Sequence, residues 1–94
     1  MNTETNLANQ RKAAIAFLEQ QGGVEKISFT QEGGKPGLGA YWCANVVVTI
    51  AGKEYQEIIG IHVLGGDPLP DIAPTSRPIP VTVVFSDGSS EVIE

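Results

Sequence analysis

The stretch that decides the fold is Ala40–Leu64, which reads AYWCANVVVTIAGKEYQEIIGIHVL. Over residues 40–50 the apolar side chains recur at every second position, which is the period of a β-strand with one buried face. The members of that face are Trp42, Ala44, Val46, Val48 and Ile50. A tight-turn signal follows at Ala51-Gly52-Lys53, and residues 54–64 alternate in the same way. The sequence therefore predicts a long β-hairpin with strands at about 40–50 and 54–64.

The segment before this hairpin predicts a helix and a further strand. Residues 5–21 contain neither proline nor glycine, and Leu7, Ala14, Phe17 and Leu18 recur near helical spacing. Gly22-Gly23 is a typical C-terminal stop, because glycine adopts the left-handed backbone without steric cost. The period then changes to two, so we expect a helix at about 5–21 and a strand at about 24–30.

The segment after the hairpin divides into a loop and a second hairpin. Residues 65–80 hold five of the six prolines and predict a long extended loop, because proline lacks the backbone donor that a central strand needs. Its apolar residues lead us to expect that it lies against the domain. Asp87-Gly88 is a hairpin-turn signal between predicted strands at about 81–86 and 89–93.

These elements predict an α+β fold in which one N-terminal helix packs on an antiparallel sheet of four to five strands. Short connections and the lack of crossover helices favour antiparallel order. In a simple meander, the 31–39 and 65–80 loops would lie at one end of the sheet. The turns at Gly52 and Gly88 would lie at the other end, together with the C-terminus of the helix.

Composition narrows the classes of function. The 94 residues are enough for a single domain spanning 1–94, and six Lys and Arg against eleven Asp and Glu give a net charge of −5. This charge argues against a nucleic-acid partner, which would require clustered cations. One cysteine and one histidine predict no internal disulfide, no metal site and no cofactor. No apolar run approaches 18 residues, so we expect no membrane insertion of this chain.

Several segments together resemble a known family. They are Lys26–Thr30, the glycine- and proline-rich loop that ends at Pro36–Gly39, the pair Tyr41-Trp42, and Gly52–Tyr55 at the hairpin turn. The combination resembles small Gram-positive lipoproteins of unknown function with a cystatin-like fold. The resemblance covers roughly residues 24–64 and the preceding helix. It implies the fold and an address at the cell surface or outside the cell, and it implies no activity.

The N-terminal residues of this sequence lack the basic and apolar regions of a secretory leader, and no lipidated cysteine precedes the helix. Cys43 cannot replace that cysteine because it lies in the middle of a predicted strand. Two locations therefore remain open. The chain is either the mature part of a surface protein or, if Met1 is the native start, a cytoplasmic protein.

The residues suggest three possible chemical roles: nucleophilic catalysis, protease inhibition and a pocket on the sheet. Cys43 and His62 are the candidate nucleophile and base, but no third group is indicated to orient them. The segment Gln56–Gly60 is close to the inhibitory motif of true cystatins, yet it falls inside a predicted strand rather than in a turn. A small enzyme or pocket domain using the concave face of the sheet is the principal alternative, and a cystatin-type protease inhibitor is a remote one.

We therefore expect a non-enzymatic binding domain, with contacts concentrated on loops that a rigid sheet carries. The partner would be a protein or a cell-wall component. Aromatic side chains beside a glycine-rich loop can stack on a sugar or anchor a protein, although Trp42 can equally pack in the core. The candidate binding residues are Gly34, Pro36, Gly37, Tyr41, Trp42, Asp67 and Asp71.

Self-association is a further possibility. The strand containing Val46-Val47-Val48 is apolar on both faces, whereas one helix covers only one of them. Either a second copy, giving a homodimer, or the proline-rich loop would cover the other face.

Overall fold

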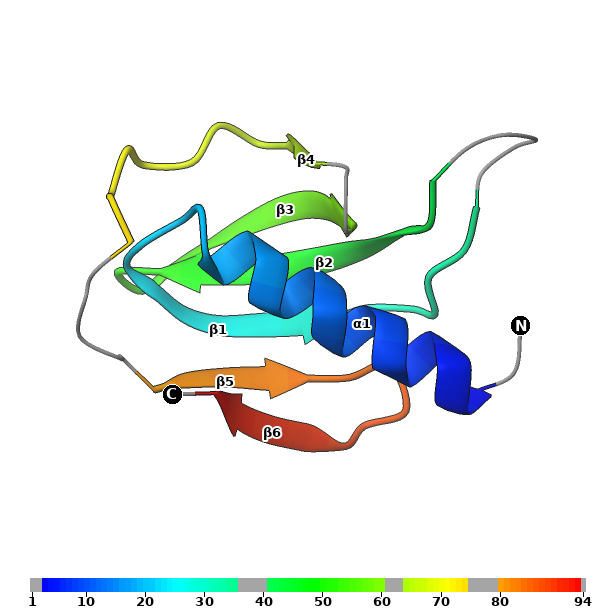
Figure 1. Cartoon of the computed structure of the whole chain (residues 1–94). Coiled ribbons are helices and arrows are strands. Elements are labelled where there is room, and N and C mark those ends of the chain that lie inside the picture. Colours follow the sequence, from blue (N-terminus) through cyan, green and yellow to red (C-terminus); the bar gives the residue numbers. More distant parts are fainter. Residues whose placement is uncertain (1–2, 36–40, 61–63, 75–79, 94) are drawn as a thin grey trace.

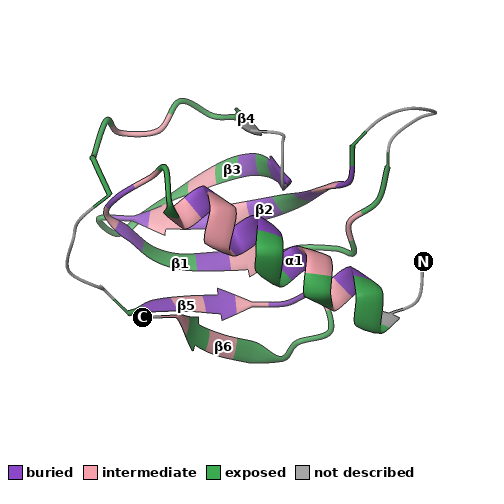
Figure 2. Cartoon of the chain, viewed as in Figure 1, coloured by how far each residue is buried: buried purple, intermediate pink, exposed green. Residues whose placement is uncertain are grey.

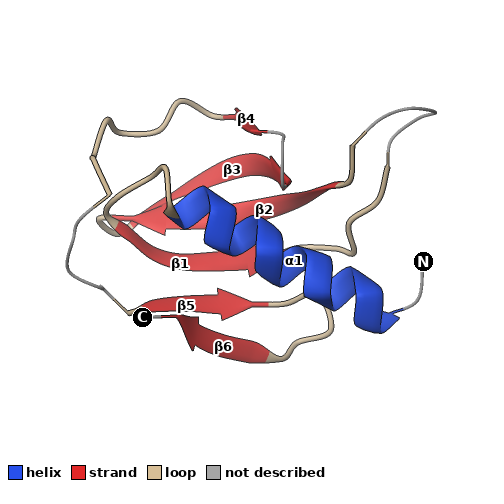
Figure 3. Cartoon of the chain, viewed as in Figure 1, coloured by secondary structure: helices blue, strands red, loops and turns tan. Residues whose placement is uncertain are grey.

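The computed structural model describes residues 3–35, 41–60, 64–74 and 80–93. It shows one helix lying across one face of a single sheet (Figure 1), with the secondary structure coloured in Figure 3. The elements in chain order are α1 (Thr3–Leu18), β1 (Val24–Phe29), β2 (Cys43–Ile50), β3 (Lys53–Gly60), β4 (Leu64–Gly66), β5 (Val81–Val84) and β6 (Ser90–Ile93). The predicted α+β class is confirmed, with one N-terminal helix packed on the sheet.

The helix buries a stripe that is apolar at one end and polar at the other. Of the predicted stripe, Ala14 and Phe17 are buried in the core and Leu7 and Leu18 are partly buried against it, while Ala13 is buried in addition. One turn and two turns earlier, Gln10 and Asn6 are also buried. The predicted helix ran to residue 21, but α1 ends at Leu18 and the chain then turns through Gly23, which has φ of +76°.

The central hairpin forms as its alternation predicts. Strands β2 and β3 pair antiparallel from Cys43 opposite Gly60 to Ile50 opposite Lys53. The two residues that join them, Ala51 and Gly52, have φ of 52° and 78°. Positive φ at both central positions is the geometry of a tight turn whose twist matches that of its flanking strands.

The sheet has the order β4-β3-β2-β1-β5-β6, and it is mixed. Strand β5 pairs parallel with β1, with Ile27 opposite Val83, so the predicted antiparallel meander is wrong at this position. Parallel neighbours require a long crossover connection. The connection between β4 and β5 is long enough to reach from one side of β1 to the other. Residues 65–80 were predicted to connect neighbouring strands, whereas the strands on either side of the connection, β4 and β5, lie on opposite sides of β1 in the sheet.

The predicted 54–64 strand is too long, because β3 ends at Gly60 and a separate strand spans the boundary with the predicted 65–80 loop. Leu64–Gly66 forms β4, which pairs with β3 from Ile59 opposite Leu64 to Glu57 opposite Gly66. After β4 the chain packs against the domain as expected. Leu69 lies partly buried against the core, and Gly22 at the end of the helix donates to the carbonyl of Ile72 at 2.8 Å.

The core lies between the helix and the face of the sheet that the helix covers (Figure 2). The predicted apolar face of β2 is buried throughout. The other core side chains in the sheet layer are Val24, Ile27, Phe29, Ile59, Val81, Val83 and Phe85. The opposite face of the sheet is only half-buried or exposed, and it includes Ile58 and Val92 among the exposed large apolar residues.

Candidate functional site

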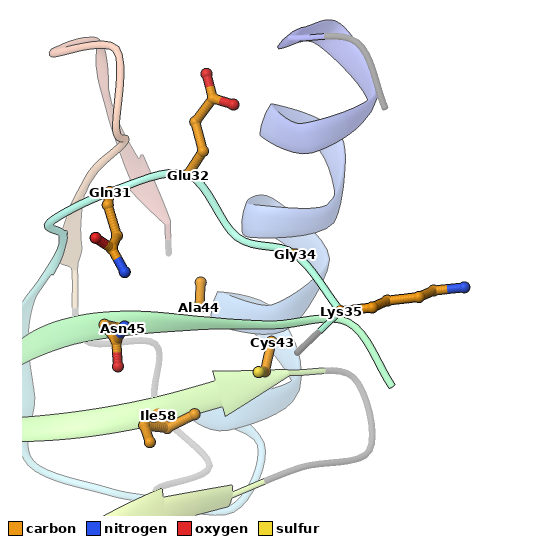
Figure 4. Close-up of a pocket in the computed structure, with 8 residues that line it drawn as sticks. All are labelled: Gln31, Glu32, Gly34, Lys35, Cys43, Ala44, Asn45 and Ile58. Carbon is orange, nitrogen blue, oxygen red and sulfur yellow. The ribbon is translucent and has the colours of Figure 1, made fainter. Parts of the chain in front are cut away.

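A shallow depression of about 410 Å³ lies where β1 connects to β2. Two backbone hydrogen bonds of 2.9 Å between Gly34 and Cys43 close the base of this connection and extend the sheet beyond β1. The depression therefore lies beside the bridge between Gly34 and Cys43. Its lining residues, drawn in Figure 4, are Gln31, Glu32, Gly34, Lys35, Cys43, Ala44, Asn45 and Ile58.

The lining combines polar groups with an apolar surface. Cys43 and Asn45 alternate with the core residue Ala44 on β2, so both belong to the face that the helix leaves uncovered. Ile58 lies beside them on β3, opposite Asn45. Lys35 extends away from the depression in Figure 4. The Glu32 side chain also points away in Figure 4, so the groups that face the depression are amides, a thiol and one aliphatic side chain.

The buried polar residues of α1 hold this end of the molecule in place. The Asn6 side chain donates to the carbonyl of Gly33 at 2.7 Å and accepts from the Gly33 amide at 3.1 Å. Gln10 does the same with Ser86, donating to its Oγ at 2.8 Å and accepting from its amide at 3.1 Å. Gln10 Nε2 also donates to Asn6 Oδ1 at 2.8 Å. Because every one of these buried groups is paired, the network fixes the helix to two separate connections.

Trp42 belongs to the core rather than to the binding surface. It is only 6% exposed. A Cβ atom added to Gly33 would lie 2.1 Å from the indole ring, so Gly33 is where the chain crosses that ring closely. Trp42 Nε1 is buried without a hydrogen-bond partner in the described structure. The alternative reading of Trp42 as a core residue is therefore the correct one.

Tyr41 has the opposite environment. It precedes Trp42 directly and is 63% exposed, the most exposed large apolar side chain among the residues that the structure describes. Of the other predicted binding residues in this connection, Gly34 lies in the bridge to Cys43, and Pro36 and Gly37 lie outside the described residues.

The two aspartates do not join this site, contrary to the meander prediction. Asp67 lies beside Gln56 in β3, where its carboxylate accepts from the Gln56 amide at 2.9 Å. Asp71 stands between Pro70 and Ile72, whose carbonyls accept hydrogen bonds from Gln21 and Gly22 at the C-terminus of the helix. Both aspartates belong to the connection between β4 and β5 and lie away from the β1–β2 end of the sheet.

The turn at Gly88 lies at the β1–β2 end of the sheet, whereas the meander prediction placed it at the opposite end with the turn at Gly52. Because β5 runs parallel to β1, the chain leaves both strands at the same end of the sheet. The neighbouring contacts of Asn6 and Gln10 with Gly33 and Ser86 show the same proximity. Within the turn, hydrogen bonds from the hydroxyl and the amide of Ser89 lower the pKa of Asp87.

The candidate nucleophile and base cannot be assembled from the described residues. Cys43 is a free, half-buried thiol in the lining of the depression. His62 lies outside the described residues. In the parts of the chain that are described, no three side chains of the metal-ligating types lie together.

One buried acid, Glu57, was not among the residues that the sequence singled out. Glu57 lies on β3 opposite Val46, on the face that the helix covers, and is only 4% exposed. Its burial raises its pKa, and the negative charge of Asp67 raises it further. The alternation of β3 contained the signal, because Glu57 falls between Tyr55 and Ile59 on their shared face.

Among the described residues, no helix has both the length and the apolar character needed to cross a membrane. No protein-family model, curated protein or solved structure matches this chain.

Proposed function

We propose that this chain is a non-enzymatic binding domain, the soluble part of a bacterial surface protein, and that it binds a cell-wall glycan at the β1–β2 end. The observation that carries the proposal is the highly exposed Tyr41 beside the depression at Gly34 and Cys43. An exposed aromatic ring costs little conformational entropy when it binds, and it offers an apolar face together with a polar hydroxyl group. The resemblance to small Gram-positive lipoproteins supports the surface address.

The chemistry of the depression favours a neutral, polar ligand over an anionic one. Its amides come from Gln31 and Asn45, and Ile58 supplies apolar area. The net charge of −5 disfavours long polyanions, because such a chain repels them at long range. A glycan that carries hydroxyl and acetamido groups fits this combination of amides and an exposed aromatic ring.

The test is chemical-shift mapping of the labelled protein with soluble peptidoglycan fragments. We expect shifts at residues 31–35 and 41–45, and we expect Tyr41→Ala to weaken binding at least about tenfold, as loss of an aromatic anchor does. Val92→Ala is the matched control, because Val92 is also highly exposed but lies on the edge strand β6. Absence of shifts in the wild-type protein, or equal binding by both variants, would contradict the proposal.

Self-association has its own supporting observation. The proline-rich connection, where it is described, packs near the C-terminus of the helix through Leu69 and Ile72. The uncovered sheet face retains Ile58 at 41% and Val92 at 56% exposure. We therefore propose a homodimer through this face as the second candidate. Sedimentation should detect it, and Ile58→Ser together with Val92→Ser should abolish it. A wild-type monomer at high concentration would exclude it.

A further inference from the structure

The edge of the sheet formed by β3 and β4 contains a buried acid that neither proposed function uses. Glu57 is only 4% exposed, and its Oε2 atom has no hydrogen-bond partner in the described structure. Leaving this oxygen unpaired and buried disfavours the ionised form, and burial together with the charge of Asp67 outweighs the hydrogen bond to the Asp67 backbone, which by itself lowers the pKa of Glu57. The group is therefore most easily accommodated in its protonated form.

Strand β4 is the element that covers this acid. Gly66 stands directly opposite Glu57 in the β3–β4 ladder. A Cβ atom placed on Gly66 would lie 3.1 Å from Glu57 Oε2 and 2.5 Å from the carbonyl oxygen of Gln56. Gly66 also has φ of +118°, which side chains rarely tolerate. Glycine at this position lets β4 lie flat on the carboxyl group.

Few interactions hold β4 in this closed position. The strand has three residues, Leu64–Gly66, and is followed at once by Asp67. The Asp67 amide donates to the Gln56 carbonyl at 3.0 Å, and Asp67 Oδ2 accepts from the Gln56 amide at 2.9 Å. A short edge strand with exposed hydrogen bonds belongs to the least stable part of a fold, so it can open locally without global unfolding.

The charges around Glu57 favour opening once it ionises. Directly after β4 the neighbouring charge is Asp67, an acid whose negative charge raises the pKa of Glu57. On β2 the residue opposite is Val46, and on β3 the neighbours on the same face are Tyr55 and Ile59. The described charged residues of α1 are Glu4, Arg11, Lys12 and Glu19, and all four are exposed rather than turned toward the sheet. Lys53, further along the same face of β3, places its Nζ atom 5.3 Å from the centre of the Tyr55 ring, and no described cation forms an ion pair with Glu57.

We propose that β4 and Asp67 form a pH-dependent cover of the β3 edge, closed over protonated Glu57 and opened by its ionisation. In the closed state the Glu57 carboxyl binds its proton more tightly than an exposed carboxyl does. In the open state water solvates the carboxylate, and the backbone edge of β3 is free to pair with another strand. Ionisation of Glu57 raises the ratio of open to closed molecules by about tenfold for each unit by which its pKa in the closed state exceeds its pKa in the open state.

The experiment measures hydrogen exchange at the Asp67 amide, whose acceptor is the Gln56 carbonyl. Protection is corrected for the intrinsic effect of pH, and the Glu57 carboxyl is titrated by carbon NMR in the same samples. We expect protection at Asp67 to fall as pH rises through the titration of Glu57. In Glu57→Gln, which mimics the protonated acid, protection should stay constant over the same range.

Two further variants separate the cover from general effects of charge. Asp67→Asn keeps an oxygen for the Gln56 amide and removes a charge that raises the pKa of Glu57, so the fall in protection should be smaller than in wild type and complete at lower pH. Glu54→Gln removes an exposed carboxyl from the same strand and should behave as wild type. The proposal is overturned if wild type and Glu57→Gln show the same protection at every pH. It is also overturned if amides in β1 and β2 lose protection in parallel with Asp67.

Discussion

The two faces of the sheet differ sharply although the same strands build both. On the covered face, Ile27, Val48 and Ile59 are fully buried beneath the helix. On the other face, Ile58 and Val92 remain largely exposed. The covered face therefore provides the packing free energy, because apolar area removed from water is the dominant favourable contribution. The uncovered face and the connections at its ends are free to carry binding.

The largest test of this comparison is a pair of isoleucine truncations. Ile27→Ala should lower the free energy of unfolding by about 2–5 kcal/mol, because it leaves a cavity in the central strand β1. Ile58→Ala, at 41% exposure on the other face, should cost about 1 kcal/mol or less. Denaturant unfolding of the two variants measures both changes. Equal losses would show that the uncovered face is packed in solution.

A second test concerns the polar end of the helix. Gln10→Ala should cost about 1–3 kcal/mol, because it removes the partner of the Ser86 amide in a largely buried network. Lys12→Ala, at an exposed position of the same helix, serves as the control. Thermal unfolding compares the two variants. A Gln10→Ala midpoint equal to that of the control would show that the network contributes no stability.

A third test uses pH. Because the pKa of Glu57 is raised in the folded state, its contribution favours folding at low pH and is lost as pH rises from its ordinary value of 4.5 through the folded value. Asp87 acts in the opposite sense and only at lower pH, because its folded pKa lies below its ordinary value of 3.8. At pH values above 7, Glu57→Gln should therefore have a higher thermal midpoint than wild type, and near pH 4 the two midpoints should differ little. A parallel offset at both pH values would contradict this assignment.

The smallest expected effect is at the exposed ion pair between the helix and β6. Arg11 Nε contacts the Glu91 carboxylate at 3.0 Å, and this contact raises the pKa of Arg11. Water and salt screen such a pair, so Arg11→Gln should change the thermal midpoint only slightly at low salt. In 1 M sodium chloride the difference from wild type should vanish. A large, salt-independent loss would mean that the aliphatic part of Arg11 packs against β6.

Local pattern predicted the elements well and their partners less well. The alternation in β2 identified every buried residue of that strand, because a two-residue period depends only on the chain itself. The parallel pairing of β1 with β5 was missed, because connection length allows both a meander and a crossover. Strand β4 was not predicted as a separate element, because Leu64 was assigned to the preceding strand and the two glycines after it carry no periodic signal.

The candidate site was predicted only in part for the same reason. Gly34 lines the depression and Tyr41 is exposed two residues before Cys43, whereas Trp42 is buried in the core. Asp67 and Asp71 were grouped with them through the meander, and the crossover connection places both elsewhere. Gln10 and Asn6 read as ordinary polar helix residues, since their partners Ser86 and Gly33 are distant in the sequence.

The sequence by itself determined the α+β class, the central hairpin and the apolar face of β2, because helical and strand periods and turn residues act over a few neighbouring positions. Only the tertiary structure decided which strands are neighbours, which polar residues are buried and which acid is covered. These properties depend on contacts between distant segments, such as β1 with β5 and Glu57 with Gly66. The free energy of such contacts depends on the whole packed arrangement and is not encoded in any one segment.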